Sequence, residues 1–77
     1  MKIQVLGTGC AKCKQLTANA EKAVAELGVQ AVVEKVEDLR EIRKFGVMTT
    51  PALVVDGEVK SAGKLLSPQD VKQLLGA

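Results

Sequence analysis

The sequence predicts an α/β domain in which a mixed four-stranded sheet is flanked by helices. Strand-like and helix-like apolar patterns alternate through the first half of the chain, and a strong β-hairpin signal follows in the second half. The 77 residues suffice for a single small domain, residues 1–77, and are too few for two. Phe45 is the only aromatic residue, so we expect an aliphatic core.

The first half of the chain is typical of a β-α-β unit. Lys2–Leu6 is an aliphatic and β-branched run that stops at Gly7, as a buried strand does. Apolar residues then recur at helical spacing, at Leu16, Ala20, Val24 and Leu27. Gly28 supplies the C-cap of this helix. The valine-rich run 29–36 predicts a second strand, parallel to the first because a helix connects the two.

The remaining elements are marked by caps and turns. Asp38 is the expected N-cap of a shorter helix that ends at Gly46 and has three apolar positions, Leu39, Ile42 and Phe45. The Asp56-Gly57 pair between two β-prone segments predicts a hairpin. A last helix begins with an N-cap, a proline and an acidic capping-box partner, Ser67, Pro68 and Asp70, and ends at Gly76. The resulting order is β-α-β-α-β-β-α.

Composition excludes several classes of function. Without an aromatic platform, and with a net charge of only +2, the chain is not expected to bind nucleic acid. The absence of histidine excludes hydrolysis of the Cys/His or Ser/His kind. No run approaches the roughly 20 apolar residues of a membrane span, and we expect a cytoplasmic monomer without a membrane partner. Cysteines in that compartment are typically redox-active or metal-binding.

Cys10 and Cys13 form a Cys-x-x-Cys pair at the junction between the first strand and the first helix. Their spacing places the two sulfurs about one helical turn apart. Cys10 lies in the first turn, where free N–H groups and the helix dipole stabilise a thiolate, so we expect its pKa in the range of roughly 3.5 to 7.5. Cys13 continues the inward row of apolar residues. Cys10 is therefore the expected nucleophile and Cys13 the resolving thiol.

Other interpretations of this pair remain open. Lys12 either stabilises the thiolate or is an ordinary solvated lysine. The two cysteines could be incidental, or they could hold Cu(I) between two soft thiolates. The stretch from Gly7 to Gly28 resembles heavy-metal-associated domains, although Thr8 stands where those domains have a methionine. Those domains have β-α-β-β-α-β order, whereas here a capped helix is expected after the second strand.

The segment FGVMTTPALVVDG resembles the thioredoxin and glutaredoxin superfamily. Pro51 follows Thr50 at the position where that superfamily has a cis-proline facing its cysteines. The resemblance implies the minimal thioredoxin fold and is nearest to small archaeal and bacterial proteins called redox-active disulfide protein 2. The matching positions are Gly7, Cys10, Cys13, Gly28, Gly46-Val47, Thr50-Pro51-Ala52, Asp56-Gly57 and Gly63.

This resemblance implies a disulfide reductase, active on disulfide-containing proteins and fed by a thioredoxin-reductase-type flavoenzyme. Thr50 and Pro51 would line the substrate groove. Thr49 and the residues between the cysteines, Ala11 and Lys12, are further candidate substrate-binding residues.

The chain also departs from the family pattern. Gly9 replaces the tryptophan that precedes the first cysteine of ordinary thioredoxins, and Gln4 stands where they bury an acid. The sequence therefore identifies no proton acceptor for Cys13. Glutaredoxins place an acid after a glycine near the last helix to hold glutathione, but Lys64 follows Gly63 here.

Our first hypothesis is a thiol-disulfide oxidoreductase that cycles a Cys10-Cys13 disulfide and needs no metal or further cofactor. The second is a soft-metal carrier that uses the same two thiols. The third is an interaction protein that keeps only the fold.

Overall fold

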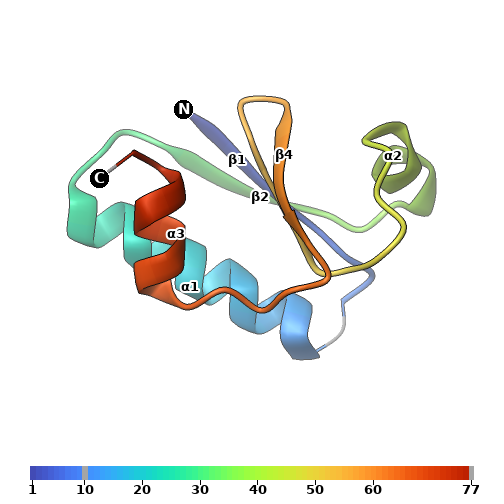
Figure 1. Ribbon diagram of the computed structural model, residues 1–77, viewed down its shortest axis with the longest axis horizontal. Helices are drawn as coiled ribbons and strands as arrows, with labels where there is room; N and C mark the ends of the chain where they lie inside the picture. The colour runs from blue at the N-terminus through green and yellow to red at the C-terminus, as the bar shows by residue number, and fades with distance from the viewer. Residues whose placement is uncertain (10, 77) are drawn as a thin grey trace.

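The computed structural model describes residues 1–9 and 11–76, so Cys10 and Ala77 lie outside the described residues. The element order confirms the predicted β-α-β-α-β-β-α arrangement (Figure 1). The elements are β1 (Lys2–Leu6), α1 (Ala11–Leu27), β2 (Val32–Val36), α2 (Leu39–Lys44), β3 (Ala52–Val55), β4 (Glu58–Ala62) and α3 (Pro68–Leu74).

The four strands form one mixed sheet in the order β2-β1-β3-β4. β1 runs parallel to β2 and antiparallel to β3, which in turn is antiparallel to β4. Leu6, the last residue of β1, is paired with Val36 of β2 and with Ala52 of β3. Ala52 is also paired with Ala62, the last residue of β4. The ends of β1, β2 and β4 and the start of β3 therefore meet at one edge of the sheet.

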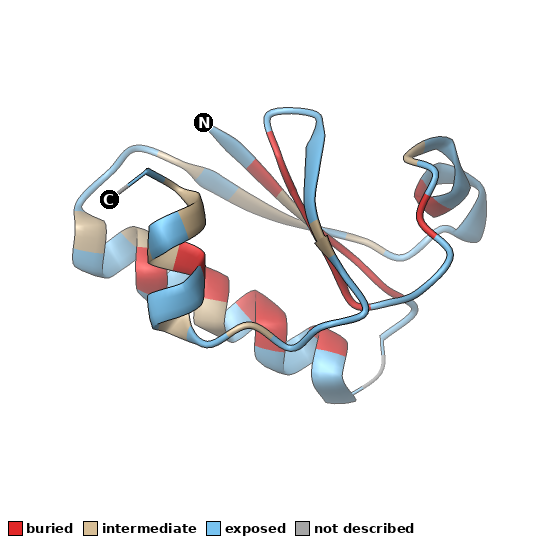
Figure 2. Cartoon of the chain, in the orientation of Figure 1, coloured by how far each residue is buried: buried red, intermediate tan, exposed pale blue. Residues whose placement is uncertain are grey.

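The helices cover both faces of this sheet (Figure 1). α1 and α3 lie on one face, over a core cluster of Ile3, Val5, Leu16, Ala20, Ala23, Leu53, Val55 and Val71. α2 lies on the other face, over a smaller cluster of Leu6, Ile42, Val47, Ala52 and Val54. Both clusters are aliphatic, as the composition predicts, and Figure 2 shows the buried positions along the inward side of α1 and along the central strands.

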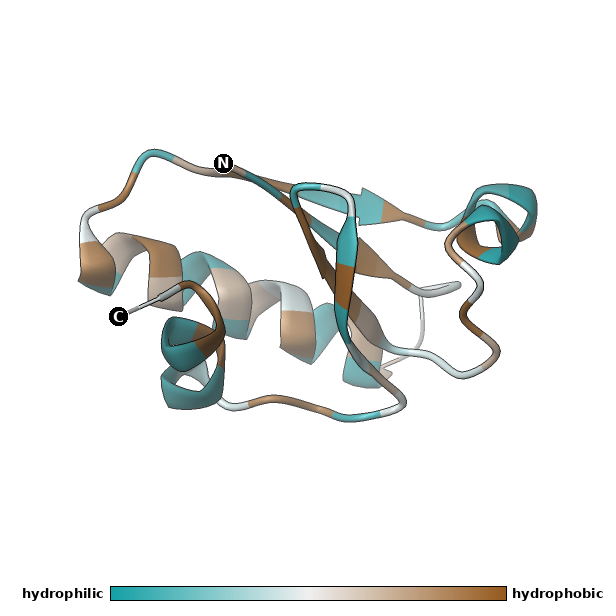
Figure 3. Ribbon diagram, turned by 45° about the horizontal axis from the view of Figure 1, so that its top comes forward, coloured by the Kyte–Doolittle hydropathy of each residue, from teal (hydrophilic) through white to brown (hydrophobic). Residues whose placement is uncertain are grey.

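α2 is held to the sheet by few apolar contacts. Figure 3 shows hydrophilic residues over most of this helix. Its one buried residue is Ile42, which is 3% exposed, and its N-cap is Asp38, whose carboxylate accepts a hydrogen bond of 2.8 Å from the Arg40 N–H. The predicted cap is thus confirmed.

The second strand is shorter than predicted, because it begins at Val32 and not at residue 29. Strand pairing explains the difference. The parallel register starts with Lys2 opposite Val32, so residues 29–31 have no partner in the sheet and instead connect it to α1. The inward row of α1 also shifts by one position, since Ala23 is fully buried and Val24 only partly.

The turn and cap predictions of the second half are confirmed. Asp56 and Gly57 both have positive φ, 50° and 83°, as a tight hairpin turn requires. Ser67 accepts from the Asp70 N–H and donates its own N–H to the Asp70 carboxylate, which forms the capping box at the start of α3. Across residues 1–9 and 11–76, no helix combines the length and apolar character that a membrane crossing requires.

Candidate active site

The loops that follow the meeting strand ends are tied together by backbone hydrogen bonds. The Gly7 N–H donates to the Val36 carbonyl at 2.9 Å, which joins the end of β1 to the end of β2. The Gly63 N–H donates to the Pro51 carbonyl at 2.8 Å, which joins the end of β4 to the start of β3. Because Leu6 is paired with Ala52, the segment that leads into α1 lies beside the segment that leads into β3.

Cys13 is buried at this edge, with 4% of its surface exposed. Its sulfur lies directly against the backbone of Gly7, where a Cβ would overlap the Sγ atom and would lie 2.9 Å from the Cys13 Cβ. The same added Cβ would lie 3.9 Å from the Cβ of Thr50. The first turn of α1 is fixed by the buried Thr17 hydroxyl, which donates to the Cys13 carbonyl at 2.9 Å. Gly7 thus brings Cys13 and the Thr50 loop together.

The peptide bond between Thr50 and Pro51 is cis. Pro51 is fully buried, whereas Thr49 and Thr50 are exposed. Gly63, with φ of 77°, packs closely on Thr49, because a Cβ at Gly63 would lie 2.8 Å from the Thr49 Oγ1. Of the residues predicted to bind substrate, Thr50 therefore lies at the surface beside Cys13. Pro51 is buried, and Thr49 packs against Gly63.

A groove of about 620 Å³ opens beside Thr50, between the loop after β1 and helix α2. It is lined by Thr8, Leu39, Ile42, Arg43, Gly46, Val47, Met48 and Thr50. Met48 is 98% exposed and Leu39 is 55% exposed, so two large apolar side chains project at this surface. Leu39 was expected with Ile42 and Phe45 among the apolar positions of this helix, but of the residues in α2 only Ile42 is buried. The exposure of Met48 was not predicted from the sequence.

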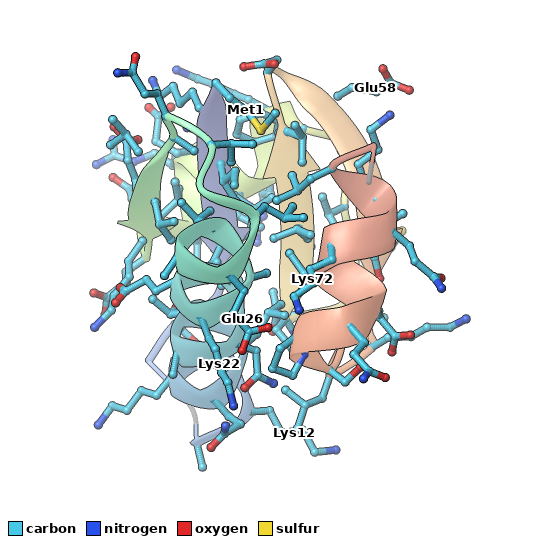
Figure 4. The ribbon with its side chains drawn as sticks, turned by 90° about the vertical axis from the view of Figure 1, so that its left-hand side faces the viewer. Met1, Lys12, Lys22, Glu26, Glu58 and Lys72 are labelled. Atoms are coloured by element: carbon cyan, nitrogen blue, oxygen red, sulfur yellow. The ribbon has the colours of Figure 1, made fainter. Side chains whose placement is uncertain are left out.

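The residues between the two cysteines lie on the exposed first turn of α1. Ala11 and Lys12 are both exposed, and Figure 4 shows Lys12 extending from the end of this helix toward solvent. The Cys10 prediction falls outside the described residues.

A second, smaller pocket of about 60 Å³ lies on the α1 side of the sheet, against Cys13. Four of its lining residues carry polar or charged side chains, namely Lys14, Thr17, Lys35 and Glu37. Neither Lys35 nor Glu37 was predicted from the sequence as a site residue. The parallel pairing of β1 with β2 was the available signal, since a register with Leu6 opposite Val36 places Glu37 beside Gly7.

Gln4 lies away from this pocket. Side chains alternate along a strand, and Ile3 and Val5 both face α1, so Gln4 faces the α2 side. There its amide donates to the Glu34 carboxylate at 3.5 Å. Gln4 therefore does not contact Cys13 from the position where ordinary thioredoxins bury an acid.

Outside the site, an ion pair joins the two helices that share a face. Lys72 of α3 pairs with Glu26 of α1, and Figure 4 shows Lys22 on the other side of Glu26. The hydrogen bond from Lys72 is the main cause that holds the pKa of Glu26 below its usual value of 4.5. Partial desolvation opposes this effect, and the charges of Lys72 and Lys22 add to it.

Residues 1–76 match the thioredoxin domain family over nearly the whole chain. The chain belongs to the thioredoxin family. It is 45% identical over 75 residues to a thioredoxin of Methanothermobacter thermautotrophicus, a match that covers 97% of each chain. It is 41% identical over 73 residues to a thioredoxin of Methanocaldococcus jannaschii, covering 95% of this chain and 84% of that one.

Membership of the thioredoxin family confirms the predicted resemblance and the class of thiol-disulfide oxidoreductases. The fold agrees with the minimal thioredoxin fold, because a four-stranded mixed sheet is flanked by α1 and α3 on one face and α2 on the other. Helix α2 follows β2, so the element order differs from that of the ferredoxin-like metal domains. These relatives give no support to the metal-carrier hypothesis.

Proposed function

We propose that this thioredoxin-family protein reduces protein disulfides by cycling a disulfide between Cys10 and Cys13. The Cys10 thiolate attacks the substrate disulfide and forms a mixed disulfide, and one substrate sulfur leaves as a thiolate. Cys13 then attacks the Cys10 sulfur, the second substrate sulfur leaves, and the Cys10-Cys13 disulfide forms. Two electrons pass from the two thiols to the substrate.

The observation that carries this proposal is the position of Cys13. A resolving thiol must be shielded from substrate and solvent, yet lie next to the attacking sulfur. Cys13 is almost fully buried against Gly7, one helical turn along the sequence from Cys10.

The groove beside Thr50 supports a peptide substrate. It lies at the same edge of the sheet as Cys13. Its lining includes Gly46, which has no side chain to cover the backbone, and the exposed side chains of Met48 and Leu39. We propose that an extended substrate segment lies in this groove, across Thr50, with its disulfide directed toward the start of α1. Ala11 and Lys12 would contact the same segment from the exposed first turn.

The cycle requires a source of two electrons after each turnover. We propose a thioredoxin-reductase-type flavoenzyme as the electron donor and disulfide-containing proteins as acceptors, which makes the chain an electron carrier. No cofactor beyond the Cys10-Cys13 pair is needed, because thiol-disulfide exchange moves both electrons. We propose that the chain acts in the cytoplasm as a monomer.

A redox titration of the metal-free protein tests this function. The protein is equilibrated in dithiothreitol or glutathione buffers of graded potential, and free thiols are counted by alkylation and mass spectrometry. We expect one reversible two-electron transition between the dithiol and an intramolecular disulfide. Failure to form this disulfide at any potential would contradict the proposal.

Two matched variants test the assignment of roles. Cys13→Ser should accumulate mixed disulfides with substrate proteins, because the attacking thiol remains and the resolving thiol is gone. Cys10→Ser should trap few, because the remaining thiol is buried. Equal trapping by both variants would show that the two sulfurs are equivalent and would overturn the assignment.

A further inference from the structure

The small pocket beside Cys13 offers a route for a proton. The proposed function requires Cys13 to lose a proton before it attacks Cys10, and Gln4, which stands where ordinary thioredoxins bury an acid, directs its amide to Glu34 on the other face of the sheet. The pocket encloses about 60 Å³ and is lined by Cys13 and Glu37 together. A water needs only about 10–15 Å³ of such space, so the pocket has room to connect the two side chains through water.

The backbone fixes Glu37 in this position. It directly follows β2, whose last residue is paired with Leu6, and the hydrogen bond from Gly7 to the Val36 carbonyl holds the two strand ends together. Side-chain alternation then directs Lys35 and Glu37 to the face that α1 covers. Glu37 is exposed at its outer side, so a proton that reaches it can continue to bulk solvent.

Gly9 allows the carboxylate to approach the cysteine loop. A Cβ at Gly9 would lie only 3.3 Å from the Glu37 Oε2 atom, and Gly9 also adopts a φ of 85° that disfavours other residues. The Cβ of any other residue at this position would come into tight contact with the carboxylate. Gly9 therefore leaves space beside the cysteine loop for the Glu37 carboxylate.

Charged residues line the pocket from each element around it. Lys14 lies on α1, Lys35 on β2, and Glu37 on the segment after β2. The two ammonium groups stabilise a thiolate, whereas the carboxylate accepts a proton and, as a charge alone, opposes the thiolate. The sign of the effect of Glu37 on the resolving step therefore distinguishes the two roles.

We propose that Glu37 is the proton acceptor for Cys13 in the resolving step, acting through water in the shared pocket. As the Cys13 proton passes to the Glu37 carboxylate, the Cys13 sulfur attacks Cys10, the Cys10-Cys13 bond forms and the bond from Cys10 to substrate breaks. The substrate sulfur is reduced and leaves as a thiolate, which takes up a proton from solvent as Glu37 releases one. This inference rests on the proposed function of the cysteine pair.

Stopped-flow reaction of the reduced protein with the aromatic disulfide 5,5′-dithiobis(2-nitrobenzoate) separates the two steps. The first release of coloured thiolate reports attack by Cys10, and the second reports resolution by Cys13. Glu37→Gln should slow the second release at least about tenfold at about pH 6, within the range of general-base effects, and should leave the first unchanged. The two proteins should converge at high pH, where the Cys13 thiol ionises without help.

Two further variants sharpen the test. Glu37→Asp keeps the carboxylate and should restore part of the rate. Glu21→Gln removes the same charge from an exposed position on α1, remote from Cys13, and should match the wild-type protein at every pH. Far-ultraviolet circular dichroism of each variant checks that the fold is retained.

Each outcome bears on one proposal. A faster second release in Glu37→Gln would show that the carboxylate acts only as an opposing charge. A second release that is as fast as in the wild-type protein, or that is slowed by the same factor at every pH, would also overturn the inference. Loss of both releases in this variant would indicate a structural role and would also overturn it. A wild-type protein that gives no second release would instead contradict the proposed function, so the two failures are distinguishable.

Discussion

Replacement of Gly7 by alanine tests how closely the site is built around the Cys13 sulfur. Gly7 has a backbone conformation outside the left-handed region, so alanine introduces no backbone strain there. The new Cβ would overlap the Cys13 Sγ and lie 2.9 Å from the Cys13 Cβ. Overpacking of this kind costs about 1–3 kcal/mol, and the lower entropy of the unfolded chain returns about 0.4–1 kcal/mol. We expect Gly7→Ala to lower the free energy of unfolding by about 1–2 kcal/mol.

The measurement is urea unfolding under reducing conditions, followed by far-ultraviolet circular dichroism because the chain has no tryptophan or tyrosine. A double-mutant cycle with Cys13→Ala isolates the sulfur, since that variant removes Sγ and keeps Cβ. Gly7→Ala should cost less in the Cys13→Ala background, with a coupling energy of at least about 0.5 kcal/mol.

Gly28→Ala is the control for the cycle. Gly28 has a φ of 66° and open space around it, so alanine there introduces backbone strain without a steric contact. Its cost should be the same in both backgrounds. If Gly7→Ala is also equally costly with and without the sulfur, or costs nothing, the proposed packing of Cys13 against Gly7 is refuted.

Three further predictions concern stability and use the same unfolding assay. Ser67→Ala should cost about 1 kcal/mol, because the Asp70 N–H loses its cap, and an unchanged urea midpoint would contradict this. Ser61→Ala should leave stability unchanged or raise it by up to about 1 kcal/mol, because among the described residues its buried hydroxyl has no hydrogen-bond partner; a clear loss would show otherwise. Glu26→Gln should be less stable than wild type above about pH 5, and the difference should shrink below 4.5 and be lost once the pH has fallen through the lowered pKa of Glu26, because the ion pair stabilises the fold only while Glu26 is ionised in the folded state. A difference that persists in acid would exclude the ion pair with Lys72 as its cause.

Much of the fold follows from local sequence signals that act over a few residues. The Asp56-Gly57 turn and the Ser67 capping box require particular residue types at particular positions, and the structure has both as predicted. The start of β2 is different, because its limit is set by pairing with Lys2. Val29 has the same β propensity as the valines of the strand, so composition alone could not find the boundary.

The site also has residues whose positions follow from local sequence and residues whose positions depend on strand pairing. The position of Cys13 on the inward face of α1 was predictable from helical spacing, and its burial agrees with that prediction. Glu37 was not predictable in this way, because its proximity to the cysteine loop depends on the register between two strands that a helix separates. The exposure of Met48 was not predicted either, and Leu39 was expected as an apolar position of α2, because the groove that exposes both is formed by packing between α2 and the loop after β1.

Gly7 and Gly9 show why departures from a family pattern have to be interpreted together with their neighbours. At Gly7 the missing side chain makes room for the Cys13 sulfur, and at Gly9 it makes room for the Glu37 carboxylate. From the sequence alone, Gly9 stands where ordinary thioredoxins have a tryptophan, and Gln4 stands where they bury an acid. In the structure a carboxylate is present on the Cys13 side of the sheet, supplied by the segment after β2 and admitted by Gly9. The carboxylate beside Cys13 is therefore supplied by the segment after β2, and the position of Gln4 on β1 supplies none.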